Sequence, residues 1–462
     1  MRKSSLLLLI TFAFFSTVHA ADTANDIANL SLEDVSFKAL NHALGSQINT
    51  DSSPFYLRGE WPTEIQSSLI PALVGVGKAF GKDQEASAFT TGSVINILAQ
   101  IYLDNPVLQN KSPISDIPKS IENGIKTFAR YESEGTYNFY PETLANGKMV
   151  RRPVGMTLFP LWYGFTNIPN DADTTSVVLS ALILNSKINN SEYTIPDSTL
   201  SKFSDFLDTN RSPMFYNKSR RRIKTGAFMT WLFDEKNPDM PRFYFADSGK
   251  GPRIPFNKND VDCVVNANIL KLMALAKQKD RPGQAEACQM LNEMIEADEH
   301  STCGIYYPNM FNLSFILGRA KTAGATCISE TSERKILQMI FKMQNPDGSW
   351  LNEKNFWKDP IITTAFAMDA LMHYSSPLDA RTFESLSKGV QFLLKNVRTK
   401  DQTLFWKAEN FFTATAVARS LVMWRSSAYT NAIIASTLIR MHHYFPQYKS
   451  ANYLDLNFEE FE

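Results

Sequence analysis

The sequence has few residues of the kinds from which metal sites are commonly built. Its 462 residues include 6 histidines, which are scattered, and 4 cysteines. The cysteines, Cys263, Cys288, Cys303 and Cys327, form no C-x-x-C pair, the spacing found in most structural zinc sites. We therefore expect no metal site, and three complete disulfide pairings of the thiols are open.

Long apolar runs are also absent beyond the start of the chain. Arg2 and Lys3 precede an apolar run from Leu6 to Phe15, and Val18-His19-Ala20 then supplies a small-x-small cleavage site. No later stretch approaches the roughly 18 uninterrupted apolar residues of a transmembrane helix. Residues 1–20 are therefore predicted to be a signal peptide, and the mature protein is predicted to be periplasmic or secreted.

The chain has no excess of basic charge. Basic and acidic residues number 47 each, so removal of Arg2 and Lys3 would leave 45 basic against 47 acidic residues, a formal charge of −2. Nucleic-acid-binding surfaces usually have a clear positive excess, so no nucleic-acid partner is expected. No long Pro-rich or Gly/Ser-rich linker interrupts the chain. Residues 21–462 are therefore predicted to form a single domain.

Apolar residues recur mostly at intervals of three and four, the period of amphipathic helices. Helix, turn and helix recur at roughly 35 to 45 residues, the rhythm of stacked helical hairpins. Such hairpins form either an open solenoid or a closed ring, and periodicity does not distinguish the two. The predicted helices are Glu64–Phe80, Thr91–Tyr102, Ile117–Tyr131, Thr174–Ser186, Thr199–Thr209, Asp262–Gln278, Gln284–Ala297, Met310–Ala323, Glu330–Met343, Ile361–His373, Phe383–Asn396, Phe412–Met423 and Ala428–His442.

Two carboxylates stand immediately before one of these apolar helices. Asp171 and Asp173 fall in the predicted capping turn, where free N–H groups and the positive helix end can hold one carboxylate charged. A like charge nearby raises the pKa of its neighbour, which can then keep its proton. The pair is a candidate general-acid site. It also fits an ordinary N-cap with a helix-dipole charge.

Two segments resemble the terpenoid cyclase and prenyltransferase α/α-toroid superfamily. Asp171-Ala172-Asp173-Thr174-Thr175 is similar to the Asp-x-Asp-Asp acid motif of class II terpene cyclases, in a variant with Thr after the second Asp. Gln344-Asn345-Pro346-Asp347-Gly348-Ser349-Trp350 is similar to the Gln…Gly-x-Trp repeat of that superfamily. The resemblance implies an all-α fold, an (α/α)6 toroid of paired helical hairpins, in which the Gln and the Trp brace successive helices.

The resemblance also implies a chemistry. Asp173 matches the acid that protonates a carbon-carbon double bond, and Asp171 matches the partner that orients it. The implied reaction is acid-initiated cyclisation of an isoprenoid, with aromatic side chains available to stabilise a carbocation. No Asp-rich motif for metal-triggered ionisation of a diphosphate is present. No cofactor is implied, except Mg²⁺ if the substrate is a diphosphate.

A second polar segment surrounds the start of another predicted helix. Asp262 and Asn266 are four residues apart, so on a helix they share one face and could reach the cavity that receives Asp173. Capping by the aspartates and a backbone bond from Asn266 would explain the same residues. Other candidates for substrate binding are Asp260, Tyr306, Tyr307, Arg319 and Trp61.

Two further functional classes fit the same sequence. Secreted α/α toroids also include glycoside hydrolases and polysaccharide lyases, and the predicted signal peptide suits them. A hydrolase needs two carboxylates roughly 5 to 9.5 Å apart, for which Asp173 and Asp262 are the first pair to consider. A toroid that binds a protein or glycan without turnover is the third class.

The signal peptide makes the first testable prediction. Protein recovered from the periplasm or medium should begin at Ala21, as measured by intact mass and N-terminal sequencing, because Ala20 completes the cleavage site. Recovery of exported protein that still begins at Met1 would contradict it.

Overall fold

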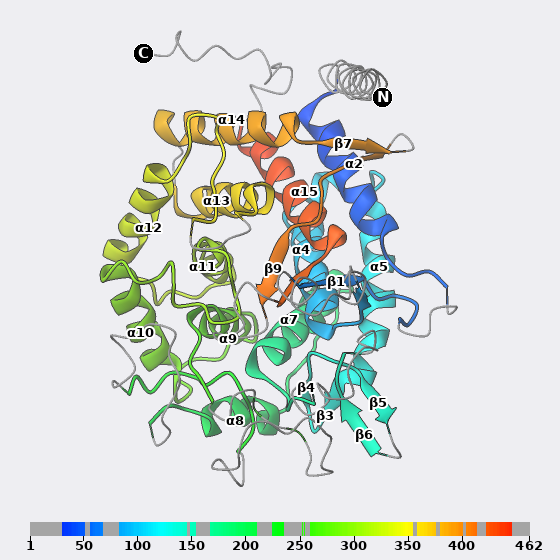
Figure 1. Cartoon of the computed structure of the whole chain (residues 1–462), viewed down its shortest axis with the longest axis vertical. Coiled ribbons are helices and arrows are strands. Elements are labelled where there is room, and N and C mark those ends of the chain that lie inside the picture. Colours follow the sequence, from blue (N-terminus) through cyan, green and yellow to red (C-terminus); the bar gives the residue numbers. More distant parts are fainter. Residues whose placement is uncertain are drawn as a thin grey trace, which may run out of the picture.

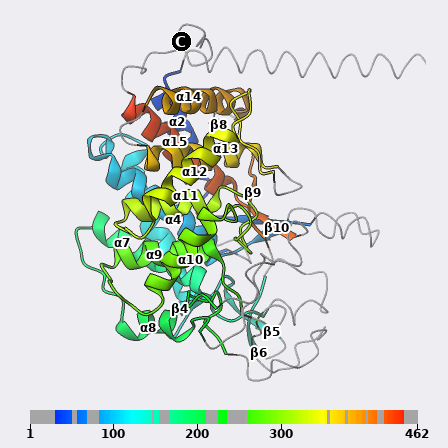
Figure 2. The same ribbon diagram turned by 90° about the vertical axis from the view of Figure 1, so that its left-hand side faces the viewer.

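A computed structural model describes the ranges 30–50, 56–67, 83–145, 148–153, 167–209, 224–234, 259–353, 358–375, 379–400, 403–413 and 422–445, with residues 252 and 254. The predicted signal peptide lies outside these ranges. Figure 1 shows the chain as helices arranged around a common centre, and Figure 2 shows the same arrangement from the side. Within the described residues, no helix is long and apolar enough to cross a membrane.

Six inner helices form a closed ring. Each packs against the next in chain order, and the last, α15, packs back against the first, α4, so the toroid predicted by the resemblance is confirmed. Inner helices are buried on nearly every side, as every residue of α4 from Ala88 to Ile101 illustrates. The inner helices are α4 (Ala88–Asp104), α7 (Ala172–Ile188), α9 (Cys263–Leu275), α11 (Asn312–Thr322), α13 (Pro360–Tyr374) and α15 (Ser427–Tyr444).

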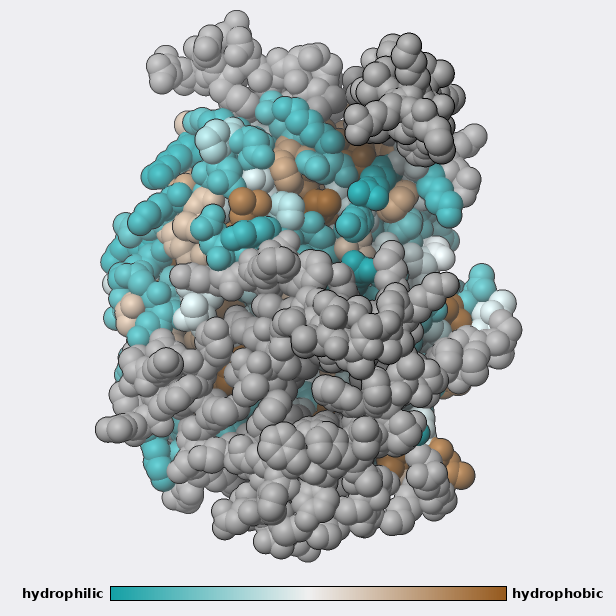
Figure 3. Space-filling model, in the orientation of Figure 1, coloured by the Kyte–Doolittle hydropathy of each residue, from teal (hydrophilic) through white to brown (hydrophobic). Residues whose placement is uncertain are grey.

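Outer helices surround this ring and bury only one face. In α14, for example, buried positions such as Leu386, Val390 and Leu393 recur at three and four residues, which is the amphipathic pattern visible in the sequence. Figure 3 shows mainly hydrophilic residues on the exposed surface over the outer helices α12 and α14. The outer helices are α2 (Leu32–Gly45), α5 (Ile117–Ile125), α8 (Asp197–Asp205), α10 (Gln284–Glu296), α12 (Glu330–Lys342) and α14 (Ala380–Lys395).

Three predicted helices differ from the structure, and one observed helix was not predicted. Helix α2 begins at Leu32 with a capping box formed by Ser31 and Asp34, a signal that the periodicity did not isolate. The predicted helix Ile117–Tyr131 divides into α5 and the 3₁₀ helix η3 (Lys126–Tyr131). Two shorter 3₁₀ helices, η1 (Pro106–Leu108) and η2 (Ile114–Asp116), precede α5.

The other two helix predictions were wrong where the structure describes them, because they fall on strands. Strands β1 (Thr63–Ser67), β2 (Asp83–Glu85), β9 (Asn410–Thr413) and β10 (Val422–Arg425) form an antiparallel sheet in the order β2-β1-β10-β9. The predicted helices Glu64–Phe80 and Phe412–Met423 begin or end in this sheet. Pairing between distant segments, including the Glu64–Arg425 ion pair at 2.8 Å, overrides the local helical spacing there.

Three two-stranded hairpins complete the secondary structure of the described residues. In each hairpin, two strands that are adjacent in sequence pair in antiparallel register. They are β3 (Glu132–Ser133) with β4 (Thr136–Tyr137), β5 (Glu142–Ala145) with β6 (Lys148–Arg151), and β7 (Arg398–Lys400) with β8 (Thr403–Phe405).

Three buried tryptophans connect outer helices to inner ones. The indole Nε1–H of Trp350 donates to the carbonyl of Ile340 in α12 at 2.7 Å, and its backbone N–H donates to Thr364 Oγ1 in α13 at 3.1 Å. Trp61 and Trp406 repeat both bonds, with α2 and α4 and with α14 and α15 respectively. Trp61 is therefore a structural residue, and its prediction as a substrate-binding residue is not supported by its position.

The glutamine of the repeat motif also braces two helices, as the resemblance implied. Gln344 donates from Nε2 to the carbonyl of Ser385 at 2.8 Å, and its Oε1 accepts from the hydroxyl of that residue at 2.6 Å. Gly348 follows with φ of +85°, and a Cβ there would lie 2.1 Å from the carbonyl oxygen of Lys388. Only glycine fits this turn.

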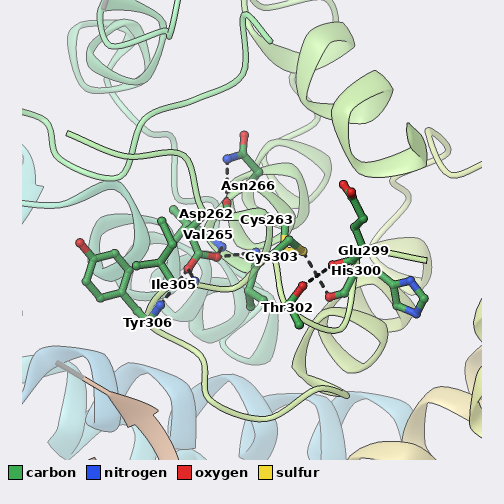
Figure 4. Close-up of a disulfide and its surroundings, with 11 residues drawn as sticks. Asp262, Cys263, Val265, Asn266, Glu299, His300, Thr302, Cys303, Ile305 and Tyr306 are labelled. Atoms are coloured by element: carbon green, nitrogen blue, oxygen red, sulfur yellow. Dashed lines mark hydrogen bonds between the residues drawn. A yellow bond between two sulfur atoms is a disulfide. The ribbon is translucent and has the colours of Figure 1, made fainter. Parts of the chain in front are cut away.

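Two disulfides select one of the three open pairings. Cys263 at the start of α9 is bonded to Cys303 in the loop before α11, as Figure 4 shows. Cys288 in α10 is bonded to Cys327 in the loop before α12. The bond between Cys263 and Cys303 leaves no free thiol at the start of α9.

The tryptophan contact yields a stability prediction. Thr364→Val keeps the shape of the side chain but leaves the buried N–H of Trp350 without its acceptor, so the free energy of unfolding should fall by about 1–3 kcal/mol. Urea denaturation with the disulfides intact measures this. The matched control, Thr331→Val on the exposed side of α12, should change stability by less than about 0.5 kcal/mol. Equal effects of the two changes would contradict this role for Thr364.

Candidate active site

The capping turn of α7 holds the two predicted carboxylates. Asp171 is the N-cap residue, and its Oδ1 accepts a hydrogen bond from the backbone N–H of Thr174 at 2.6 Å. Asp173 lies in the first turn and is 4% exposed. Burial raises the pKa of Asp171 to about 7, although the bond from Thr174 acts to lower it. Both aspartates therefore occupy the positions that the sequence indicated.

Asp173 receives hydrogen bonds from two neighbouring elements. The Tyr307 hydroxyl donates to Oδ2 at 2.6 Å, and Asn268 Nδ2 donates to Oδ1 at 2.7 Å. Asn268 Nδ2 also lies 3.0 Å from the Tyr307 hydroxyl. Burial, followed by the nearby charge of Asp171, raises the pKa of Asp173 well above its ordinary value, and the two donors oppose this rise. Burial therefore favours the protonated form of Asp173, and the two donors favour its carboxylate.

Asp262 has a different role from the one first considered. It caps α9, and its carboxylate accepts from the N–H groups of Val264, Val265, Ile305 and Tyr306. Figure 4 shows the carboxylate directed at these backbone groups beside the Cys263–Cys303 disulfide. Its oxygens are therefore committed to the backbone.

Asn266 is similarly committed to backbone groups. Its Oδ1 accepts from the N–H of Phe228 at 3.1 Å, and its Nδ2 donates to the carbonyls of Phe228 and Asp262. Asp262 and Asn266 are thus brought together, but by capping and loop bracing. The prediction that both face the cavity of Asp173 is not supported by these contacts.

Asp260 and Tyr306 form a separate buried pair. The Tyr306 hydroxyl donates to Asp260 Oδ2 at 2.6 Å and accepts from Trp231 Nε1 at 3.1 Å. Burial raises the pKa of Asp260 to about 7, opposed by hydrogen bonds from its neighbours. Neither residue lines the cavity described next.

A small cavity lies beside the donors of Asp173, inside the ring. Its volume is about 30 Å³, room for one or two water molecules. Asp173 itself is not among the lining residues, but both of its donors are. The lining residues are Phe89, Ser93, Asn96, Ile97, Val177, Asn268, Lys271, Tyr307, Phe315, Ile316, Arg319 and Tyr429.

Aromatic rings crowd one side of this cavity. The ring centroid of Phe89 lies 6.1 Å from that of Tyr307, in an edge-on arrangement. Phe412 in β9 lies 5.6 Å from Tyr307 and 5.3 Å from Phe89. Phe139, Phe411 and Trp424 extend the cluster. Such faces carry negative quadrupole charge and can stabilise a cation.

A buried charge network closes the other side. Arg319 on α11 donates to both oxygens of Asp369 on α13, each at 3.2 Å, and its guanidinium stacks 4.6 Å from the ring centroid of Phe315. Burial alone would raise the pKa of Asp369, but Arg319, His373 and Arg440 together hold it well below its usual range. Arg319 therefore lines the cavity, where a substrate-binding residue would be expected. Two of its guanidinium N–H groups, however, already donate to Asp369.

Comparison with solved structures shows which known proteins share this fold. The sequence matches no protein-family model, and no curated protein matches it. A variant of the type II terpene cyclase MstE from Scytonema, in complex with geranylgeranyl dihydroxybenzoate, aligns with a TM-score of 0.56 at 13% identity, over 92% of this chain and 99% of that one. The protein has the fold of a type II terpene cyclase.

Two other solved structures agree with this terpene cyclase fold. MstE without ligand aligns with a TM-score of 0.55 at 12% identity, over 92% of this chain and 99% of that one. A protein from Actinoplanes aligns with a TM-score of 0.53 at 10% identity, over 88% of this chain and 99% of that one. At such identities the similarity establishes the fold, and the site rests on the contacts described above.

Several residues of the site were not singled out from the sequence as site residues. Asn268 stood in the second polar segment, but nothing in its spacing showed that it bonds Asp173. Lys271 interrupts an otherwise apolar helix from Ile269 to Leu275, and a charged residue in a helix buried on all sides was the available signal. Asp369 gave the same signal between Ala365 and Met372, and Tyr429 gave none.

No cluster in the described part of the chain suggests a resident metal. Groups of three or more histidines, cysteines, aspartates or glutamates placed to hold an ion are absent from those residues. Near the cavity, Asp173 is bonded by Tyr307 and Asn268, and Asp369 is paired with Arg319. These residues do not offer the set of free oxygen ligands that Mg²⁺ requires.

The buried acids predict how stability depends on pH. Asp171 and Asp260 keep their protons up to about pH 7 when folded but lose them near their ordinary value of 3.8 when unfolded. Stability should therefore fall as the pH rises from about 4 to about 7.

Asp260→Asn should reduce this dependence by up to about 1.4 kcal/mol per pH unit, measured by urea denaturation across that range. The control Asp280→Asn, at an exposed position, should leave the dependence unchanged. A wild-type protein whose stability rises steadily from pH 4 to 7 would contradict the prediction.

Proposed function

We propose that this protein catalyses acid-initiated cyclisation of an isoprenoid, with Asp173 as the general acid. The observation that carries the proposal is a buried Asp173 carboxyl with a raised pKa, held by Tyr307 and Asn268 beside a partly aromatic cavity. A general acid must be protonated at the working pH and must also release its proton to a weak base.

The step needs no co-reactant. The proton passes from the Asp173 carboxyl to one carbon of a substrate double bond, leaving the cation on the more substituted carbon. A second double bond of the substrate then attacks this cation and forms a carbon-carbon bond, and loss of a proton ends the reaction. Tyr307 and Asn268 each donate to one oxygen of the resulting Asp173 carboxylate, so both oxygens are stabilised as charge develops.

The aromatic side of the cavity serves the cationic intermediates. Phe89, Tyr307 and Tyr429 line it, and Phe412 packs behind Phe89 and Tyr307. Ring faces attract a cation without offering a lone pair that would trap it. A substrate that fills the cavity would displace the water that could otherwise quench the cation.

The structural neighbours support the substrate class. MstE variants are described with geranylgeranyl dihydroxybenzoate as substrate and with merosterolic acid A as product. Because the present cavity is about 30 Å³, an isoprenoid can enter only if lining side chains rearrange. Substrate binding is therefore expected to be accompanied by movement of the cavity walls.

The carbohydrate alternative has less support from the site. A glycoside hydrolase needs a second carboxylate free to act with Asp173, and Asp262 uses its oxygens to accept four backbone N–H groups. A binding toroid without turnover would not need an acid held neutral by burial. Both alternatives are outcomes of the test below.

Export of the protein also stands as a proposal. Two disulfides occur among its described residues, and such bonds persist chiefly in oxidising compartments. They support the predicted signal peptide, which would place the enzyme in the periplasm or outside the cell.

Asp173→Asn tests the assignment. The mature wild type, Asp173→Asn and the control Asp280→Asn are incubated with a panel of polyprenyl alcohols, acids and diphosphates and a panel of polysaccharides, and products are identified by mass spectrometry. Loss of the general acid should lower turnover of the prenyl substrate about 10²–10⁴-fold, while Asp280→Asn should match the wild type.

Cyclised product formed equally well by Asp173→Asn would refute the role of Asp173. Turnover of glycans alone would establish the carbohydrate alternative. Saturable ligand binding by the wild type without turnover of either panel would establish the binding alternative.

A further inference from the structure

Lys271 is a buried cation that the acid chemistry does not use. It lies on α9, is 6% exposed and lines the cavity. Its Nζ donates to Asn96 Oδ1 at 2.9 Å, and this amide is neutral. Among the described residues, no ion pair involves Lys271. Burial of an unpaired ammonium is costly, so the sequence would be expected to avoid it unless the charge has a use.

The surrounding charges do not neutralise Lys271. Arg319 is paired with Asp369, and Arg440 lies 3.6 Å from both Asp369 and Asp104. Two guanidinium groups therefore face two carboxylates. His373 also lies 3.2 Å from Asp369, and burial lowers the pKa of this histidine. In this part of the described structure, Lys271 is therefore the one basic side chain without a carboxylate partner.

Lys271 and the acid lie along the same side of α9. Asn268, which donates to Asp173, is three residues before Lys271, so the two side chains leave neighbouring turns on one face. The rise between them along the helix is about 4.5 Å. A group bound at Lys271 would thus lie about one helical turn from the Asn268 that holds the proton donor.

We propose that Lys271, with Arg319 beside it, forms a subsite for a single carboxylate carried by the substrate. This inference rests on the proposed function, because it names the substrate of that same site as an isoprenoid acid. The carboxylate would accept from Nζ of Lys271 and neutralise the one surplus charge.

A single negative charge fits better than a diphosphate. Nε and Nη2 of Arg319 donate to Asp369, so the ammonium of Lys271 is the main donor left for a ligand. A diphosphate would bring two or more negative charges into a buried region with one unpaired cation, and the excess would be costly. The limited volume of the cavity also favours the smaller carboxylate group.

The carboxylate would also make the cavity suitable for a carbocation. An ammonium at the wall repels a positive intermediate, and this repulsion is strong in a region of low dielectric constant. Pairing with a substrate carboxylate cancels the field before Asp173 delivers its proton. The same pairing would raise the pKa of Lys271, which burial and then the charge of Arg319 lower to about 7 in the unliganded protein.

Binding measurements in the absence of turnover test the subsite. The mature Asp173→Asn protein is titrated by calorimetry with farnesoic acid, farnesol and farnesyl diphosphate, which share one prenyl chain. The acid should bind at least about tenfold more tightly than the alcohol and more tightly than the diphosphate.

Lys271→Met, added to Asp173→Asn, should remove the preference for the acid, because Met is also unbranched and flexible but lacks the ammonium. Lys342→Met is the matched control on the exposed side of the outer helix α12 and should keep the preference. Circular dichroism and thermal unfolding verify that each variant is folded.

Proton uptake gives a second readout that does not need the Lys271 variant. At pH 8, Lys271 is mostly neutral, so binding of farnesoic acid to Asp173→Asn should take up close to one proton, measured in buffers of different ionisation enthalpy. Farnesol should cause no such uptake.

Equal affinity for acid and alcohol, tighter binding of the diphosphate, absence of proton uptake, or an acid preference that survives Lys271→Met would each overturn the proposal. These results are independent of turnover. A carboxylate preference in a protein that cyclises nothing would uphold the subsite and remove the proposed function. Cyclisation without that preference would do the reverse.

Discussion

A hydrogen bond between an inner helix and the loop before it is the contact on which the architecture depends. In five inner helices, a Thr or Asn near the start of the helix accepts a hydrogen bond from the backbone N–H of an aromatic residue. The aromatic ring is thereby fixed between an inner and an outer layer, and a buried N–H obtains its acceptor. The pairs are Thr91 with Trp61, Thr175 with Tyr137, Asn266 with Phe228, Thr364 with Trp350, and Asn431 with Trp406.

The same device arranges the candidate site. Thr175, which anchors Tyr137, is two residues from Asp173, so the capping turn of α7 is held to its neighbouring loop. Asp262 accepts from Ile305 and Tyr306, and this fixes the loop from which Tyr307 reaches Asp173. Asp262 thus acts on the acid through the backbone, as a positioning residue. The acid is assembled from three elements, none of which suffices alone.

The sequence predicted those parts whose signals are local. The Asp-x-Asp-Thr-Thr segment gave the capping turn, and helical periodicity gave most helices, because both depend on residues a few positions apart. Ring closure required the resemblance, since it depends on contact between α4 and α15. The sheet was missed because β1 pairs with β10 across most of the chain. Lys271 was passed over because its surroundings come from α4 and α11, far away in sequence.

Ring closure has a consequence for how the chain matures. The first described helix, α2, packs against the last described helix, α15, which also completes the inner ring against α4. The hydrophobic interior is therefore sealed only after α15 has left the ribosome. Contacts so distant in sequence form slowly, because the intervening loop must first be closed. Until then, residues that are buried in the finished protein are exposed to water.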